Sequence, residues 1–412
     1  MAIRQPADVE LGGIDWTGAF AERTRADVGG GLASILALAN ATDLISFSGG
    51  FPDPATFPGR ELLAIFADLV ASGDATALQY APTRGLPGPL SFVAERLAAR
   101  EGRRPEAAEL MITSGGVEAL ELLGKSLLDP GDLALVEAPT YLGAIMAFRS
   151  FQANVVGVPM DDHGLDVDGV EAAIRRHGRP KLLYSIPDHQ NPTGVSLAGD
   201  RRDALVELAR RHGFLVVEDV AYRDLGFSEQ RPPSLWTVGP DVVVQSGTFA
   251  KTFFPGVRLG WAAGPDPVIE QMVLAKQNTD QCAGALGQRL LEEYGRGGGL
   301  ERQAERAREL YGRRCGLLME ALAAHLPADV RWTRPRGGFF SWLTLPAAVD
   351  TATLAEAALE RKVAFVPGRP FFADGGGRNT LRLAFSRVAD DDVDEGVRRL
   401  ASVLEPALGH AR

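Results

Sequence analysis

One lysine of this chain has neighbours that point directly to chemistry. Lys251 lies in the run Ser246-Gly-Thr-Phe-Ala-Lys-Thr-Phe-Phe-Pro-Gly-Val-Arg-Leu-Gly-Trp261, and Arg258 follows it by seven positions. A lysine amine can form a Schiff base with the aldehyde of pyridoxal phosphate, while Thr248 and Arg258 offer a hydroxyl donor and a cation to the phosphate. Because a lysine near a glycine-rich turn is ordinarily just solvated, the prediction depends on the rest of the chain.

A second motif has the features of a phosphate cradle. Ser114, Gly115 and Gly116 stand between a predicted strand and a helix that we expect to begin near Val117. Glycines at such a junction let backbone N–H groups approach an anion at the positive end of the helix dipole. The same pattern also occurs in ordinary turns, so by itself it is weak.

Two further runs carry polar groups suited to a pyridoxal ring. Asn191, in Tyr184-Ser-Ile-Pro-Asp-His-Gln-Asn-Pro-Thr-Gly194, could donate to a phenolate oxygen, and Tyr222 could reach the same atom. Asp219 closes a hydrophobic run, where its carboxylate could pair with a protonated pyridine nitrogen and keep the ring an electron sink. The alternatives are an Asn-Pro turn and a helix N-cap aspartate.

The elements that must position these residues alternate between short strands and longer helices. This order predicts an α/β fold with βαβ units around a mostly parallel sheet. Ligands of such sheets bind beyond the carboxyl ends of the strands, where the candidate residues stand. We expect strands at 133–136, 181–186, 214–218 and 241–245, and a helix at 201–212.

The pattern changes after about residue 296. A long charged helix at 301–324 precedes four predicted strands and a terminal helix, which indicates a smaller α+β domain. We therefore expect an N-terminal arm over the site, a large cofactor-binding domain and a small C-terminal domain, at 1–45, 46–296 and 297–412.

Composition narrows the class of protein. A chain of 412 residues with 45% hydrophobic content is long enough for two globular domains. A net charge of −10 argues against a nucleic-acid partner. Cys282 and Cys315 are too few and too far apart for a disulfide framework or a thiolate metal site, so we expect no metal. We find no signal peptide and no 18-residue apolar run, so we predict a cytoplasmic protein without a membrane partner.

Together these motifs resemble one family. From about Trp16 to its end the chain is similar to the fold-type I pyridoxal-phosphate aminotransferases of class I/II, particularly the 2-aminoadipate and kynurenine aminotransferase branch. The shared runs are Ser48-Gly-Gly-Phe-Pro52, Leu78-Gln-Tyr-Ala-Pro-Thr83, Gln190-Asn-Pro-Thr-Gly194 and Asn379-Thr-Leu-Arg-Leu383. The resemblance implies pyridoxal 5′-phosphate as cofactor, amino acid and 2-oxo acid substrates, and a homodimer with shared sites.

The resemblance also implies roles for single residues. Lys251 would be the Schiff-base lysine and proton shuttle, and Asp219 would pair with the pyridine nitrogen. Asn191 and Tyr222 would hold the ring oxygen, with Tyr141 stacked on the ring. The other implied contacts are with the cofactor phosphate (Ser114, Gly115, Gly116, Val117, Thr248, Arg258 and the neighbouring subunit's Tyr80) and with the substrate (Gly50, Asn191 and Arg382).

Three departures from the family pattern concern affinity and specificity. Ala250 stands where serine often precedes the lysine, which removes one phosphate hydroxyl. Asp188 and His189 stand where a small polar residue and an aromatic are more usual. His189 could partly replace the stacking aromatic or be a solvated loop histidine; we favour the loop histidine and assign it no role. The run 28–39 has no cation near Ala33, which favours a substrate with an uncharged side chain.

The predicted reaction is a two-stage exchange. An L-amino acid would give its amino group to the cofactor and leave as a 2-oxo acid, and a second oxo acid would reverse the steps. A decarboxylase, β-lyase or oxidase on the same scaffold would use the same Lys251 and Asp219 and stays open. The non-enzymatic alternative is an effector-sensing module of a regulator, which we disfavour because the residues before Ser46 hold no helix-turn-helix pattern.

Overall fold

Eight short strands form the central sheet of the computed structural model, which describes residues 16–24, 43–73, 75–228 and 231–410. The strand order is β2-β9-β8-β7-β6-β3-β4-β5, and the run from β8 to β4 is parallel. The mostly parallel sheet that the sequence predicts is therefore confirmed. The strands are β2 (Leu110–Thr113), β3 (Leu133–Ala138), β4 (Asn154–Asp161), β5 (Gly164–Leu165), β6 (Leu182–Ser185), β7 (Leu215–Asp219), β8 (Val243–Thr248) and β9 (Gly260–Ala263).

Helices cover both faces of this sheet, which explains why its strands are apolar on both sides. Leu183 of β6 belongs to the core on one face, and its neighbour Tyr184 belongs to the core on the other. The Leu183 face packs on α4 (Pro87–Glu101), α7 (Val167–His177), α8 (Gly199–His212) and α9 (Leu235–Val238). The Tyr184 face packs on α5 (Gly116–Leu127), α6 (Leu142–Ser150) and α10 (Asp266–Gln277).

Local sequence accounts for the ends of these helices. In α8, Asp200 stands in the first turn and Arg210, Arg211 and His212 in the last, which matches the charges to the helix dipole. Gly213 then ends the helix with a left-handed φ of 69°, a conformation that favours glycine. The helix predicted at 201–212 is confirmed within two residues.

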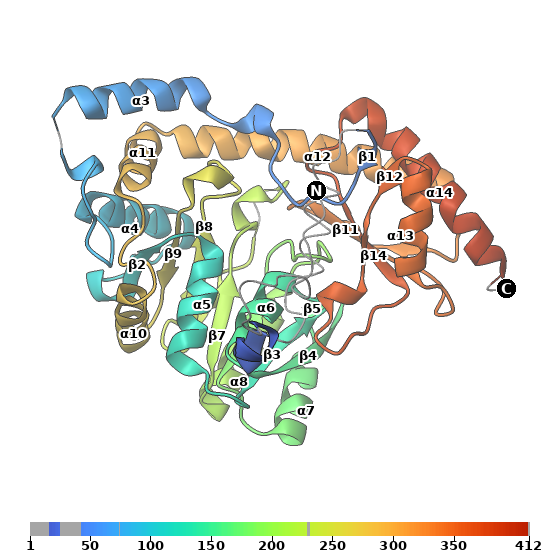
Figure 1. Cartoon of the computed structure of the whole chain (residues 1–412), viewed down its shortest axis with the longest axis horizontal. Coiled ribbons are helices and arrows are strands. Elements are labelled where there is room, and N and C mark those ends of the chain that lie inside the picture. Colours follow the sequence, from blue (N-terminus) through green and yellow to red (C-terminus); the bar gives the residue numbers. More distant parts are fainter. Residues whose placement is uncertain (1–15, 25–42, 74, 229–230, 411–412) are drawn as a thin grey trace.

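A second, antiparallel sheet follows in the chain, in the order β10-β11-β14-β13. The long helix α12 runs along the top of Figure 1 from the large sheet to this smaller one. The elements of this part are β10 (Arg331–Trp332), β11 (Phe340–Thr344), β12 (Val363–Ala364), β13 (Val366–Pro367), β14 (Thr380–Ala384), α12 (Gly299–His325), α13 (Thr351–Glu360) and α14 (Val393–His410). The remaining elements are α1 (Trp16–Ala19), β1 (Ile45–Ser46), α3 (Gly59–Ala71) and α11 (Ala285–Arg296).

The predicted domain division stays a prediction, and one strand departs from it. β1 pairs in parallel with β12, so residues 45–46 lie against the predicted small domain. Arg314 of α12 extends this contact, because its guanidinium binds Asp53 at 2.7 Å. Most of the predicted arm, including 28–39, lies outside the described residues. No helix in the described ranges is long and apolar enough to cross a membrane.

Candidate functional site

A cavity of about 200 Å³ lies where the carboxyl ends of β7 and β8 meet the start of α5 and the strand β14. Its walls come from both sheets, so residues far apart in the sequence face one space. Eleven of the predicted site residues line it, namely Gly50, Gly116, Val117, Tyr141, Asn191, Asp219, Tyr222, Thr248, Lys251, Arg258 and Arg382. The position agrees with the expectation that ligands bind beyond the carboxyl ends of parallel strands.

The amine of Lys251 points into the centre of the site. Its Nζ donates a 3.1 Å hydrogen bond to the carbonyl of Gly50 and lies 5.7 Å from the ring centroid of Phe339. Burial lowers the pKa of Lys251 to about 8; Asp219 opposes this shift, whereas Arg382 and Arg258 add to it. A lysine with a lowered pKa loses its proton more readily than an exposed lysine and can then act as nucleophile or base.

Asp219, the last residue of β7, is held by two donors. The hydroxyl of Tyr184 donates to Oδ2 at 2.7 Å, and the backbone N–H of Ala221 donates to Oδ1 at 3.0 Å. Burial raises the pKa of Asp219, while the bonds from Tyr184 and Ala221 and the charge of Lys251 act in the opposite sense. Sequence reasoning missed Tyr184: a buried tyrosine needs a partner for its hydroxyl, but the sequence does not say which.

The cradle predicted at 114–116 faces Arg258. Gly115 has a φ of 106°, and a Cβ there would lie 2.9 Å from Nη2 of Arg258. A Cβ on Gly116 would lie 3.6 Å from Cβ of Thr248. Glycine at these two positions therefore leaves room beside the hydroxyl and the guanidinium for a small anion at the start of α5.

Three predicted cofactor ligands do not line the cavity. Gly115 lies just behind its wall, beside Arg258. The hydroxyl of Ser114 is turned away, since it donates to Asp280 at 2.6 Å and lies 3.3 Å from Nζ of Lys276. Tyr80 is 80% exposed on the surface of the chain.

Arg382 is a buried cation whose partners are neutral. Its Nη1 donates to Oδ1 of Asn191 at 2.9 Å, and its Nη2 donates to the carbonyl of Ser48 at 2.8 Å. The guanidinium lies 4.4 Å from the ring centroid of Phe340 and 4.9 Å from that of Phe371. Within the described ranges, no carboxylate pairs with Arg382 and its Nε has no hydrogen-bond partner. Burial lowers its pKa to about 10, so an entering carboxylate would gain a strong partner.

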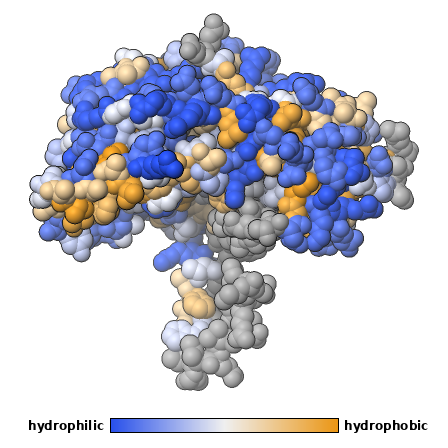
Figure 2. All heavy atoms as spheres, turned by 90° about the horizontal axis from the view of Figure 1, so that it is seen from above, coloured by the Kyte–Doolittle hydropathy of each residue, from blue (hydrophilic) through white to orange (hydrophobic). Residues whose placement is uncertain are grey.

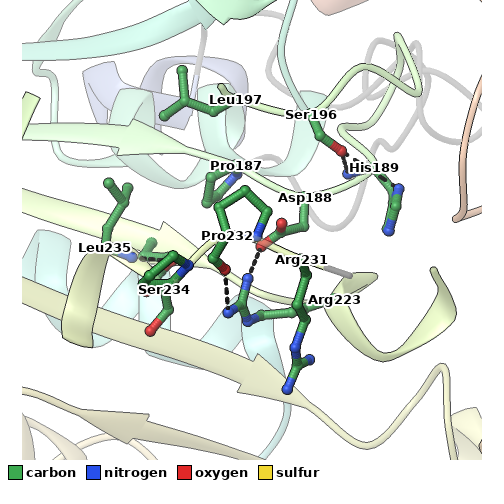
Figure 3. Close-up of polar contacts among 12 residues, drawn as sticks. Pro187, Asp188, His189, Ser196, Leu197, Arg223, Arg231, Pro232, Ser234 and Leu235 are labelled. Atoms are coloured by element: carbon green, nitrogen blue, oxygen red, sulfur yellow. Dashed lines mark hydrogen bonds and ion pairs between the residues drawn. The ribbon is translucent and has the colours of Figure 1, made fainter. Parts of the chain in front are cut away.

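The side chain of His189 is half-buried rather than fully solvated. Its backbone N–H donates to the hydroxyl of Ser196 (Figure 3), and its side chain packs so closely on the segment before β11 that a Cβ at Gly338 would lie 2.8 Å from it. Burial lowers the pKa of His189 to about 4.

The neighbouring Asp188 is buried, and Figure 3 shows its contact with Arg223. Arg202 and Arg223 each donate to it at 2.7 Å. Burial alone would raise the pKa of Asp188, but the two guanidinium groups lower it to about 2. Asp188 therefore has a structural role that the sequence alone did not indicate.

Comparison with known proteins agrees with this geometry. The family model for aminotransferase class I and II matches residues 54–400. The chain belongs to this family. The aminotransferase is 39% identical to the 2-aminoadipate transaminase of Thermus thermophilus, over 96% of this chain and 98% of the relative. It is 36% identical to aromatic-amino-acid aminotransferase 1 of Thermococcus litoralis, over 96% of both chains.

A solved structure gives the same result. The α-aminoadipate aminotransferase from Thermus thermophilus, complexed with N-(5′-phosphopyridoxyl)-L-leucine, superposes with a TM-score of 0.89 at 38% identity, over 96% of this aminotransferase and 100% of that chain. The resemblance to fold-type I aminotransferases is thereby confirmed, and the protein is a transaminase.

The cofactor of the aminotransferase is pyridoxal 5′-phosphate, and the residues present fit it. The cavity offers an amine at Lys251, a buried carboxylate at Asp219 and a cation at Arg258. Each of these groups has a counterpart in the cofactor, namely its aldehyde, its pyridine nitrogen and its phosphate.

Proposed function

We propose that this aminotransferase takes the amino group from an L-amino acid with a neutral aliphatic or aromatic side chain and transfers it to a 2-oxo acid. The observation that carries this proposal is the composition of the cavity. Among the described residues its cations are Lys251, Arg258 and Arg382, and the other walls are largely apolar, with Phe51, Val117, Leu120, Leu142, Ile186 and Phe371. With the first two cations engaged by the cofactor, Arg382 alone is left for a substrate carboxylate.

Arg382 would bind the α-carboxylate. Its buried charge lacks an ion-pair partner in the described chain, and Phe340 and Phe371 hold the plane of the guanidinium. Asn191 bonds to Arg382 through Oδ1, and its side chain also bonds to Tyr222, so the amide joins the proposed carboxylate ligand to the proposed ring-oxygen ligand. A substrate held there would have its Cα close to Lys251.

Lys251 and Asp219 would carry the chemistry. When bound, pyridoxal phosphate delocalises the electron pair that a substrate leaves at Cα. Nζ of Lys251, with its pKa near 8, would take the Cα proton and return it elsewhere on the conjugated system. Asp219 would keep a proton on the pyridine nitrogen, while Tyr222 and Asn191 would donate to the ring oxygen and Tyr141 would stack on the ring.

The phosphate would lie at the start of α5. The backbone N–H groups of Gly115, Gly116 and Val117, the hydroxyl of Thr248 and the guanidinium of Arg258 are the proposed ligands. Ser114 would contribute through its backbone, because its hydroxyl is engaged with Asp280.

The proposed assembly is a homodimer in which the exposed Tyr80 of each chain reaches the partner's phosphate site. The single chain leaves this tyrosine outside its own cavity, as such sharing requires. A cytoplasmic location stays a prediction.

The test is a single-turnover absorbance scan of the cofactor-loaded protein against L-leucine, L-phenylalanine, L-2-aminoadipate and L-glutamate, with each organic product identified by mass. We expect leucine and phenylalanine to give their 2-oxo acids fastest. A fastest reaction with 2-aminoadipate or glutamate would refute the preference for neutral side chains. Release of carbon dioxide or a cleaved side chain instead of a 2-oxo acid would refute transamination.

Lys251→Ala is the control for this scan. The variant should bind the cofactor through the phosphate ligands and yet form no 2-oxo acid, because no other described amine lines the cavity. Lys276→Ala would be a poor control, since that lysine is fully buried between Glu118 and Asp280 and its loss would leave their charges unpaired.

A further inference from the structure

A buried carboxylate beneath the site has no part in the reaction described above. Glu137 stands near the end of β3, is 1% exposed and does not line the cavity. It accepts hydrogen bonds from the Ser185 hydroxyl at 2.6 Å, the Ile186 N–H at 3.2 Å and the Gln190 amide at 2.9 Å. Burying a carboxylate is costly unless hydrogen bonds replace those it made to water. Three donors meet that need here, so the question is what the buried carboxylate contributes.

The amide of Gln190 uses all of its hydrogen-bonding capacity. Its Nε2 donates to Glu137 and to the carbonyl of Pro139 at 2.7 Å. Its Oε1 accepts from the N–H of Thr193 at 2.9 Å and from the hydroxyl of Thr193 at 2.8 Å. These four bonds, to Glu137, Pro139 and twice to Thr193, fix the orientation of the amide, and Nε2 also lies 3.5 Å from the sulfur of Met160.

These bonds join two turns that carry site residues. Pro139 belongs to the turn that leads from β3 to Tyr141, and Thr193 closes the turn that contains Asn191. Tyr141 and Asn191 are the proposed stacking residue and the proposed donor to the ring oxygen. A single carboxylate–amide pair therefore ties together the turns on two sides of the proposed ring position.

We propose that Glu137 and Gln190 are positioning residues, which set the spacing between Tyr141 and Asn191 and so the orientation in which the pyridoxal ring is held. This inference rests on the proposed roles of Tyr141 and Asn191. Burial raises the pKa of Glu137 to about 7, and its donors from Ser185, Gln190 and Ile186 act against that shift, as expected of a carboxylate retained for its bonds.

The chain contains a matched control. Glu218, on β7, is also a buried carboxylate, and it accepts from the amide of Gln245 at 3.1 Å and from the N–H groups of Leu235 and Trp236. Gln245 is 1% exposed and is not one of the described residues that line the cavity. Gln190→Met and Gln245→Met thus each remove a glutamine amide that is bonded to a buried carboxylate. Of the two glutamines, only Gln190 connects the two turns.

The experiment measures pyridoxal phosphate affinity by titration of apoprotein, together with the visible circular dichroism of the bound cofactor and the thermal midpoint. We expect Gln190→Met to weaken cofactor binding about tenfold and to change the dichroic band. Gln245→Met should change neither cofactor readout and should lower the thermal midpoint less, because the Gln245 amide makes one hydrogen bond, to Glu218, and its Oε1 has no partner in the described chain. Equal effects of both variants on the cofactor, or no effect of Gln190→Met, would overturn the proposal.

A charge-swapped pair gives a second test in case Gln190→Met does not fold. In Glu137→Gln/Gln190→Glu the amide and the carboxylate exchange places, so the bond between the two side chains can form again. Cofactor affinity should then recover relative to Glu137→Gln and Gln190→Glu alone; losses that simply add would overturn the direct pairing. None of these readouts requires turnover, whereas product analysis of the wild-type protein tests transamination separately.

Discussion

At the scale of single residues, the charge of Asp219 depends on a tyrosine from the neighbouring strand. Tyr184 donates to Asp219 at 2.7 Å, and this bond favours the ionised carboxylate against the effect of burial. The proposed role of Asp219 requires it to be ionised. Tyr184 would therefore support that proposed role, although it is not a lining residue of the described cavity.

Tyr184→Phe should move the acidic limb of the pH profile to higher pH. Loss of the donor raises the pKa of Asp219, so the carboxylate becomes protonated at a pH where it is ionised in the wild type. We expect kcat/KM to fall about tenfold on the acidic limb and little on the alkaline side. Steady-state rates over a pH series measure this, with Tyr294→Phe, a buried tyrosine of α11, as control. An unshifted profile would show that Tyr184 does not hold the charge of Asp219.

At the scale of elements, the antiparallel pair β8–β9 brings Lys251 and Arg258 to one end of the sheet. The two strands pair from Gln245 with Ala263 to Thr248 with Gly260, and the connecting loop carries both cations. The indole of Trp261 lies over Gly247 so closely that an added Cβ would overlap its ring. The absence of a side chain at residue 247 therefore permits this packing.

Gly247→Ala should lower the free energy of unfolding by roughly 1–3 kcal/mol, the usual cost of overpacking. Gly316→Ala in α12 meets nothing within 4 Å and should instead be neutral or stabilise by up to about 1 kcal/mol, because alanine favours a helix. Urea unfolding of both variants measures the difference. Equal stability of the two would mean that the indole can move aside without cost.

At the scale of the whole molecule, an apolar face of α3 is left uncovered in the single chain. Leu63, Phe66 and Val70 lie three and four positions apart, so they share one side of the helix, and they are 70%, 40% and 51% exposed. Figure 2 shows apolar atoms along the left-hand edge of the molecule, on the side that carries α3 in Figure 1. An exposed apolar face of this kind is typical of a surface that binds another chain.

The proposed homodimer predicts that a charge on this face will separate the chains. Phe66→Glu should sediment as a monomer and bind the cofactor more weakly, whereas Ala64→Glu, which adds the same charge about 160° around the helix, should remain a dimer. Analytical ultracentrifugation distinguishes the two. A wild-type protein that sediments as a monomer would refute the assembly.

Shared sites make a further prediction for mixtures of two impaired variants. Lys251→Ala and Tyr80→Ala should each have low activity alone. Re-associated in equal amounts they should regain about a quarter of wild-type activity, because half of the dimers are hybrids and each hybrid has one intact site. No recovery, with hybrids demonstrated by native mass spectrometry, would place Tyr80 outside the partner's site.

The sequence by itself determined the fold class and most of the residues that we expect to hold the cofactor and substrate, eleven of which line the cavity. Apolar runs with polar residues at their carboxyl ends predicted a mostly parallel sheet, because chain geometry requires helical crossovers between parallel strands. Lys251, Asp219, Asn191 and Arg258 could be chosen because local patterns such as strand ends, an Asn-Pro turn and a hydroxyl-rich loop carry information within a few residues.

Tertiary structure decided what depends on contacts across the chain. Local sequence could not show that Tyr184 serves Asp219, that Asp280 takes the hydroxyl of Ser114, or that β1 joins β12. It also could not show that His189 is half-buried between the nearby Ser196 and the distant Gly337 and Gly338. The burial of a side chain and its hydrogen-bond partners are set by which elements pack together, so only the tertiary structure decides them. Burial and hydrogen bonds in turn shift the pKa values on which the chemistry depends.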